Sequence, residues 1–249
     1  MNELARELQA YLKQRGHALG TTGPGRDGVD GRPGDRTFAA ALAELKRSVA
    51  PPVPPPLILP GGGITVRTAL ELVGHEAIVR EAYLDSEGIW TWGVGVTSRS
   101  GHRVERYKDD PQSVQRCLEV YIWLLQTRYL PDVDDAFDGS PLTEAQRAAA
   151  LSFHYNTGAI ARASWVASVK AGRTAEARAQ IMEWRKPAAI IERRETERDL
   201  FFDGRWSSDG RATIYEVSKP SYSPRWGSAK RVDIRPEIAA LLDAERRAA

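Results

Sequence analysis

The chain has 249 residues, 42% of them apolar and 27% charged, which is typical of a globular protein with one sizeable core and room for a small second module. A net charge of +2 is too small to indicate a nucleic-acid partner. Cys117 is the single cysteine, so no internal disulfide can form, and no stretch is apolar enough for a signal peptide or a membrane span.

The first 50 residues have the pattern of a small helical module. Leu4, Leu8 and Leu12 share a helical spacing, a glycine-rich stretch at 27–34 indicates tight turns, and residues 37–45 return to helical spacing. The letters LQAYL and VDGRPGDRT in this segment resemble the peptidoglycan-binding type 1 module, a small helical bundle. The resemblance implies wall binding but no particular ligand residues, and a helical hairpin without a ligand is the alternative.

A proline-rich segment, residues 51–60, separates this module from the rest of the chain. Its prolines favour the extended polyproline II conformation, so it should act as a semi-rigid spacer of about 31 Å. Gly61, Gly62 and Gly63 would form a swivel at its end. Residues 51–63 are therefore predicted to be a linker.

An amphipathic helix should follow the linker. Apolar residues recur at helical spacing from Val66 to Val73, with Thr65 as a plausible N-cap and Glu76 in the last turn. A hairpin should come next, because strand-like segments at 82–84 and 89–92 flank four residues of turn composition. Gly93 and Gly95 then indicate close approach by a ligand or another backbone.

This arrangement places Asp85 at the mouth of the hairpin and Thr91 on its returning strand, near Glu76. Glycoside hydrolysis needs two such carboxyl groups. One is protonated and donates its proton to the leaving oxygen, and the second is ionised and assists the nucleophile. Glu76 is the predicted general acid, because a carboxyl at the end of an apolar helix is the more desolvated one, and Thr91 could hold a water beside Asp85. A solvated helix-end glutamate is the alternative for Glu76.

Three segments resemble the phage-type lysozyme family, glycoside hydrolase family 24, whose endolysins lyse bacteria. They are residues 75–97, residues 142–158 and residues 193–201, and the similarity extends over about residues 64–206. The resemblance implies that Glu76 is the general acid, Asp85 the carboxylate that supports the attacking water, and Thr91 the hydroxyl that orients it. It also implies inversion, for which the two carboxyl groups should lie about 6.5–9.5 Å apart.

Other site residues follow from the same resemblance. Thr97, Tyr155 and Ser164 match positions where relatives contact the glycan, although Tyr155 could instead be a core aromatic residue. Val96 replaces a histidine that is common in relatives, which suggests a repacked floor of the site. No cofactor and no metal ion are implied.

The rest of this domain should be mostly helical. Asp110 and Pro111 predict a helix start, and Thr143 with Gln146 predicts a capping box for a helix that Gly158 ends. Further helices are expected at 162–170, 174–184 and 190–202, where the charged run 193–199 indicates a solvated face with i,i+4 pairs. Cys117 should be buried in a helix.

Residues 207–249 lie outside the resemblance. We expect a strand at 212–217 and a terminal helix at 236–247. The aromatic residues at 222–227 could meet sugar rings, but packing against the domain is the favoured interpretation. The predicted fold class is α+β: a helical module (1–50), a linker (51–63), a mostly helical lysozyme-like domain with a small β-hairpin lobe (64–206) and an extension packed on it (207–249).

The resemblance implies a muramidase that cleaves the β-1,4 bond between N-acetylmuramic acid and N-acetylglucosamine of bacterial peptidoglycan. Such an enzyme, made in the host cytoplasm without a signal peptide, would act on the wall after a holin has opened the membrane, and it is expected to be a monomer. One alternative is a metal-dependent amidase or peptidase, although His17, His75, His102 and His154 lack ligand spacing. A catalytically silent wall-binding protein is the other.

Overall fold

The computed structural model describes residues 2–49, 57–58 and 63–248, and it divides into two compact units, Met1–Pro54 and Pro55–Ala249. Most of the predicted spacer lies outside the described residues. Leu57–Ile58 is an exception, because it forms a short strand, β1, that pairs antiparallel with β5 (Leu142–Thr143). These two residues are therefore part of the second unit.

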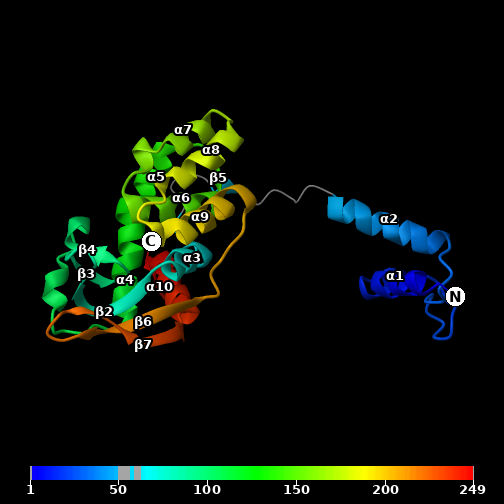
Figure 1. Ribbon diagram of the computed structural model, residues 1–249, viewed down its shortest axis with the longest axis horizontal. Helices are drawn as coiled ribbons and strands as arrows, with labels where there is room; N and C mark the ends of the chain where they lie inside the picture. Colours follow the sequence, from blue (N-terminus) through cyan, green and yellow to red (C-terminus); the bar gives the residue numbers. More distant parts are fainter. Residues whose placement is uncertain (1, 50–56, 59–62, 249) are drawn as a thin grey trace. The chain divides into compact units, whose positions relative to one another are not determined.

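The first unit contains two helices, α1 (Glu3–Gln14) and α2 (Asp35–Val49) (Figure 1). The predicted leucine stripe on α1 is only partly buried: Leu12 is 1% exposed, but Leu4 is 76% and Leu8 37% exposed. The other buried positions of α1 are Ala5 and Gln9, so a polar side chain takes the central inward position. The small apolar core consists of Leu12, Leu19 and Ala40.

Gln9 holds the loop between the two helices. Its Nε2 donates to Asp30 Oδ1 at 2.9 Å, and its Oε1 accepts from the backbone N–H groups of Asp30 at 3.1 Å and Gly31 at 2.8 Å. Gly31 has a φ of +71°, which favours glycine. A buried carboxamide thus supplies the hydrogen bonds that the loop backbone needs.

The second unit joins a helical lobe to a five-stranded sheet (Figure 1). The sheet order is β4-β3-β2-β6-β7, and β2 and β3 form the predicted antiparallel hairpin. β6 joins β2 in parallel, with Val79 opposite Tyr215, so the predicted small hairpin lobe is larger than expected. The strands are β2 (Ala77–Leu84), β3 (Trp90–Gly93), β4 (Val96–Thr97), β6 (Arg211–Ser218) and β7 (Ser223–Asp233).

Capping residues explain several helix ends. The Thr143 and Gln146 capping box and the left-handed Gly158 (φ +62°) are both confirmed at the ends of one helix. The start predicted at Asp110 is wrong, because Ser113 is the N-cap, accepting from Arg116 N at 3.0 Å. The α-helices are α3 (Val66–Gly74), α4 (Val114–Leu124), α5 (Leu130–Ala136), α6 (Glu144–Thr157), α7 (Ser164–Lys170), α8 (Thr174–Gln180), α9 (Ile191–Asp203) and α10 (Arg235–Ala248).

Short helical turns join these elements. A π-helical turn, η3 (Leu125–Tyr129), links α4 to α5, which has Pro131 in its first turn and so lacks one backbone donor there. The 3₁₀ turns are η1 (Ser98–Ser100), η2 (Val104–Tyr107), η4 (Ile160–Arg162), η5 (Ile181–Trp184) and η6 (Ala188–Ile190).

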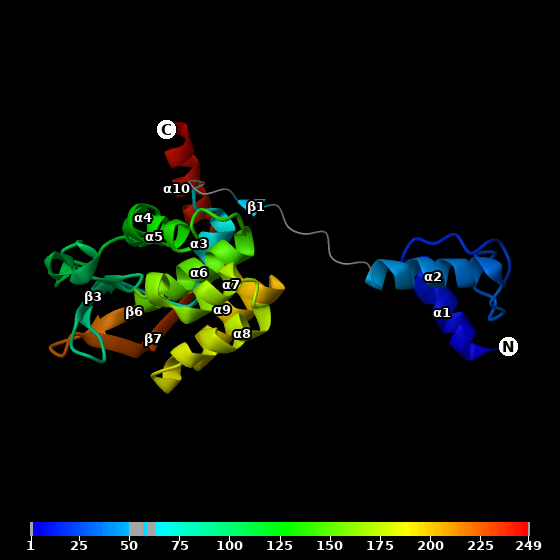
Figure 2. The same ribbon diagram turned by 90° about the horizontal axis from the view of Figure 1, so that it is seen from above.

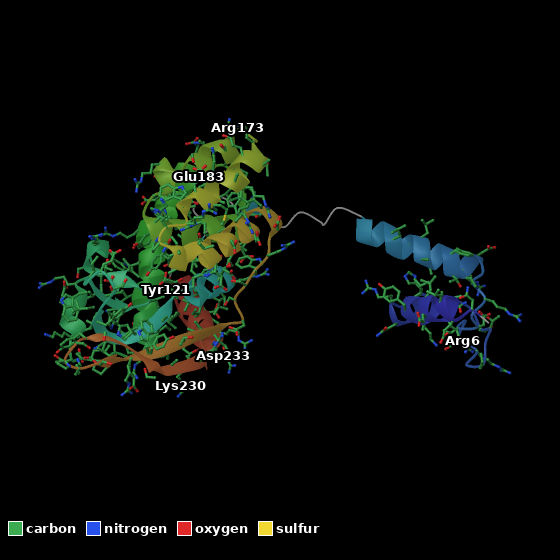
Figure 3. The ribbon with its side chains drawn as sticks, viewed as in Figure 1. Arg6, Tyr121, Arg173, Glu183, Lys230 and Asp233 are labelled. Atoms are coloured by element: carbon green, nitrogen blue, oxygen red, sulfur yellow. The ribbon has the colours of Figure 1, made fainter. Side chains whose placement is uncertain are left out.

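One apolar core runs through the second unit. It includes Trp92 of the sheet, Tyr121 of α4 and Phe153 of α6, all fully buried, and Cys117 is buried on α4 as predicted. Tyr121 lies where α4 passes between the strands and the other helices (Figure 3). Residues after 206 belong to the same core, because α10 packs on α3 and α4 (Figure 2). They contribute Ala212, Ile234, Ile238 and Leu242.

Across the described residues, the structure has no helix that is both long and apolar enough to cross a membrane.

Candidate active site

Glu76 lies at the junction of α3 and β2. Thr65 caps α3 by accepting from Thr68 N at 3.0 Å, as predicted, and His75 is the C-cap. Glu76 comes directly after this cap, just beyond the last turn in which it was expected, and its N–H donates to Val73 O at 3.0 Å. Its side chain is 21% exposed, so it is accessible from solvent but largely enclosed.

The backbone after β3 closes against Glu76. A Cβ added at Gly95 would lie 3.1 Å from Glu76 Oε2 and 3.8 Å from the Tyr155 ring, and Gly95 has a φ of +68°. A larger residue would therefore be strained by its backbone and crowd the carboxylate. A close approach was expected at Gly95 from a ligand or another backbone, but it comes from the side chains of Glu76 and Tyr155. The Tyr155 hydroxyl fixes the same backbone by donating to Val94 O.

Tyrosine rings surround the Glu76 carboxylate. Burial raises the pKa of the Tyr121 and Tyr155 phenols, and the nearby negative charge of Glu76 raises it further, so both stay protonated. The centroid of the Tyr155 ring lies 5.7 Å from that of Tyr121 and 4.9 Å from that of Tyr129. Glu76 therefore lies near a cluster of tyrosine rings, of which Tyr155 contacts the same glycine, Gly95.

Arg193 on α9 is the ion-pair partner of Glu76. Its Nη1 lies 2.5 Å from Glu76 Oε1, and its Nε donates to Glu197 Oε1 at 3.0 Å. The side chain of Arg193 is 10% exposed, and those of Arg194 and Glu197, which also pair, are fully buried. The i,i+4 pair is present, but the predicted solvated face is wrong at these positions because they pack inward toward α6 and Glu76.

Charge balance keeps Arg193 protonated. Burial alone lowers the pKa of its guanidinium, but the carboxylates of Glu76 and Glu197 outweigh burial, and the pKa is raised overall. Sequence reasoning assigned no site role to Arg193. The resemblance includes residues 193–201 and could have drawn attention to Arg193. Its ion-pair partner, Glu76, lies 117 positions away in the sequence, so no local pattern links the two.

Asp85 is held rigidly at the hairpin turn. Its Oδ1 accepts from the backbone N–H groups of Glu87 and Ile89, both at 2.9 Å, and Gly88 takes a φ of +75°. Thr91 is 4% exposed, and its hydroxyl lies 3.4 Å from Asp85 Oδ2 and 3.2 Å from Ile89 O. The structure therefore brings Asp85 and Thr91 together, as their spacing suggested.

Tyr83 connects the two halves of the site. Burial raises the pKa of its phenol, and the charges of Glu76 and then Asp85 raise it further, so both carboxylates lie within electrostatic reach of one side chain. Tyr83 is paired with Thr91 across the hairpin. Sequence reasoning missed this residue, although its position two before Asp85 on a strand was a usable signal.

The predicted glycan-contacting residues differ in placement. Thr97 lies opposite Thr91 in the strand register, and Tyr155 lies against Gly95 beside Glu76. Ser164 is exposed at the first position of α7, a helix that packs on α8. Val96, which replaces the histidine of relatives, is 1% exposed and pairs with Trp92.

Within residues 2–49, 57–58 and 63–248, no group of three or more His, Cys, Asp or Glu side chains is arranged to hold a metal ion.

Comparisons with known proteins give one family match, to the phage lysozyme family over residues 73–197. A search of curated proteins finds no match. Among solved structures, the chain is similar to an endolysin from Escherichia coli O157:H7 phage FAHEc1, with 19% identity and a TM-score of 0.49 over 61% of this chain and 100% of that one.

Two further structures are similar at 25% identity. A mutant of P22 lysozyme aligns with a TM-score of 0.47 over 56% of this chain and 98% of its own. The muramidase domain of SpmX from Asticaccaulis excentricus aligns with a TM-score of 0.44 over 56% of this chain and 97% of its own. The family match alone covers half of the 249 residues and includes Glu76, Asp85 and Arg193. The chain belongs to the phage lysozyme family, and it is a glycoside hydrolase of the muramidase type that acts on bacterial peptidoglycan.

Proposed function

We propose that the enzyme cleaves the β-1,4 bond between N-acetylmuramic acid and N-acetylglucosamine with Glu76 as general acid and Asp85 as the carboxylate that guides the attacking water. The observation that carries this proposal is geometric: Glu76 is enclosed by Arg193 and Gly95, and Asp85 lies beside Thr91, all within the segment that matches the family. Inversion of the anomeric centre would follow if the carboxyl groups leave room for a water, at about 6.5–9.5 Å.

The hydrogen bonds at the hairpin turn suit the role of Asp85. Two backbone N–H groups fix Oδ1, which leaves Oδ2 for Thr91 and a water molecule. A fixed direction matters, because a general base must point at the water that attacks the sugar. Thr91 would then orient that water with a hydroxyl that is itself anchored to Ile89 O.

Arg193 would act at the other half of the reaction. Once Glu76 has given its proton to the leaving oxygen, it is an anion, and the guanidinium at 2.5 Å stabilises that anion. Before the transfer, a bound sugar would have to loosen this ion pair so that the Glu76 carboxyl can carry the proton that it donates. Thr97 and Tyr155 would contact the glycan beside these groups, and Ser164 stays a prediction.

The first unit would hold the enzyme on its substrate. Wall binding by residues 1–50 is proposed from the resemblance to the type 1 module, and residues 51–63 would link it to the domain at 64–206 and its extension, 207–249. A monomer made in the host cytoplasm would reach the wall through a membrane opened by a holin.

Replacing Glu76 by glutamine tests the proposed acid. Glu76→Gln keeps the shape of the side chain and removes the transferable proton, so release of new reducing ends from purified peptidoglycan should fall by about 10²–10⁴-fold. Binding to the wall should be unchanged. Glu87→Gln is the matched control, because Glu87 is exposed on the same hairpin and should leave the rate unaltered.

The products of the same assay distinguish the other reaction classes. Cleavage of the glycan gives reducing ends, whereas an amidase or peptidase gives new amino groups, and a silent binding protein gives neither. Normal turnover by Glu76→Gln would contradict the assignment of the acid.

A further inference from the structure

The turn between β6 and β7 lies against the hairpin that carries Asp85. The N–H of Leu84, the residue before Asp85, donates to Tyr222 O at 2.7 Å. The Tyr222 ring packs edge-on against Trp90, the residue before Thr91, with centroids 5.4 Å apart. Leu84 and Trp90 face each other in the strand register, so Tyr222 contacts both arms of the hairpin just before its two functional residues.

Tyr222 is itself tightly held. Its hydroxyl donates to the carboxylate of Asp109, with Oδ2 at 2.9 Å and Oδ1 at 3.0 Å. The ammonium groups of Lys219 and Lys108 lie 4.0 and 4.5 Å from the centre of its ring. Asp109 is anchored in turn, since its N–H donates to Glu81 Oε1 at 2.9 Å on β2.

The backbone conformation of Tyr222 also indicates that this residue is held in place by its surroundings. Its φ of +54° lies in the left-handed region, which is uncommon for an aromatic residue and costs energy unless the surroundings hold it. The N–H of Tyr222 donates to Ser218 O at 2.8 Å, which closes the turn with the carbonyl aimed at Leu84. Tyr222 lies outside residues 73–197, so the family match does not account for it.

We infer that Tyr222 is a positioning residue, which fixes the loop of residues 85–91 from outside the catalytic segment and thereby sets the orientation of Asp85 and Thr91. The inference rests on the function proposed for Asp85. It gives the β6–β7 extension a catalytic purpose that does not depend on contact with the sugar. A small displacement of a catalytic group is enough to slow a reaction by about 100-fold.

Tyr222→Ala, made in the full-length chain, removes the ring and the hydroxyl. Hydrogen exchange of the Glu87 and Ile89 amides, which bind Asp85 Oδ1, should become faster. On soluble glycan fragments, kcat should fall by about 10- to 100-fold with little change in KM, because substrate contacts are kept. Tyr222→Phe keeps the packing on Trp90 and should recover most of kcat.

Trp226→Ala is the matched control. Trp226 is an aromatic residue on β7, 69% exposed, and its ring contacts Tyr215, which pairs with Val79 far from the Asp85 turn. This variant should change neither the exchange of the two amides nor kcat. All measurements belong at a temperature well below the unfolding midpoint of each variant, which is determined separately.

Four outcomes decide the matter. Unchanged exchange at Glu87 and Ile89 in Tyr222→Ala overturns the inference, and so does an equal loss in Trp226→Ala. Faster exchange with a lowered kcat supports it. Faster exchange with an unchanged kcat upholds the contact between the turn and the loop but refutes the role proposed for Asp85. The role proposed for Glu76 is tested separately, by Glu76→Gln.

Discussion

Gln9 in the first unit and Glu71 in the lysozyme unit are both buried polar side chains on a helix, and each holds a loop. Gln9 is 1% exposed and binds the backbone at residues 30–32. Glu71 is fully buried and accepts from Ser207 N and Oγ, at 3.0 and 2.6 Å, and from Ser208 N at 2.9 Å. Both residues accept backbone hydrogen bonds, but Gln9 is a neutral carboxamide and Glu71 a carboxyl group, and they are supported by apolar cores of different size.

The two units differ in the size of their apolar cores. The apolar core of the first unit consists of Leu12, Leu19 and Ala40, whereas the core of the second extends from the sheet through the helices to α10. A core this small leaves little stability to spare. Several large apolar residues of the first unit also remain exposed, namely Leu4, Leu8, Tyr11, Phe38, Leu42 and Leu45.

The difference in core size between the two units determines which of them can tolerate buried charged side chains. The lysozyme unit encloses Arg193, Arg194 and Glu197 close to its site, and such groups cost free energy unless they are paired. A large core offsets that cost, so the unit can keep an ion pair beside Glu76. The first unit instead buries a neutral carboxamide.

The largest expected effect on stability concerns His75 in the lysozyme unit. Burial, and then the charges of Arg193 and Arg194, lower the pKa of His75 from 6.5 to about 4. Since its side chain is 11% exposed, the full shift corresponds to about 3 kcal/mol of unfolding free energy.

The sign follows from proton uptake. Below pH 6.5 the unfolded chain binds a proton at His75 and the folded chain does not, so stability should fall as the pH decreases toward about 4 and then level off. His75→Gln should remove this part of the pH dependence in chemical denaturation. If both proteins lose stability equally between pH 6.5 and 4, His75 is not the group responsible.

Removal of residues 1–54 tests whether the two units work separately. Cleavage of short soluble glycans should be unchanged, because all proposed catalytic residues and β1 remain. Activity on whole wall should fall by up to about 100-fold, since tethering raises the local substrate concentration. A parallel loss on soluble fragments would show that the lysozyme unit depends on the first unit.

The smallest effect is expected at Gln9. Gln9→Ala leaves the buried N–H of Gly31 and the partly buried N–H of Asp30 without their acceptor, at a cost of about 2 kcal/mol. In a unit with so small a core, the amides of residues 30–32 should lose protection from hydrogen exchange while the unfolding midpoint of the lysozyme unit stays constant. Gln14→Ala is the control, because Gln14 is exposed on the same helix.

Rules that involve only neighbouring residues predicted the helix caps, the turn glycines and the hairpin of much of the chain. Thr65, the Thr143 and Gln146 capping box, Gly88 and Gly158 all behave as their neighbours in sequence predict. The β2–β3 hairpin and the closeness of Asp85 to Thr91 follow for the same reason. Strand β6 and helix α10 were also expected close to their observed positions.

Predictions failed where a distant partner changed the outcome. Leu4 and Leu8 follow a helical spacing, but hydrogen bonds to residues 30–32 turned Gln9 inward instead. Arg193 lies in a charged run that suggests solvent, and only the fold shows it against Glu76. Trp226, for which packing was favoured, is exposed, whereas Tyr222 from the same segment packs on Trp90.

The sequence by itself predicted most of the helices, the hairpin and the two proposed catalytic carboxyls, because each depends on residues that are close together in the chain. The family resemblance likewise rested on three short segments. Only the tertiary structure decided which side chains face Glu76 and which turn supports Asp85. Some of those contacts join residues more than 100 positions apart, such as Arg193 with Glu76 and Tyr222 with Leu84. Their pairing depends on how whole elements pack around the shared core, and no short sequence pattern encodes that packing.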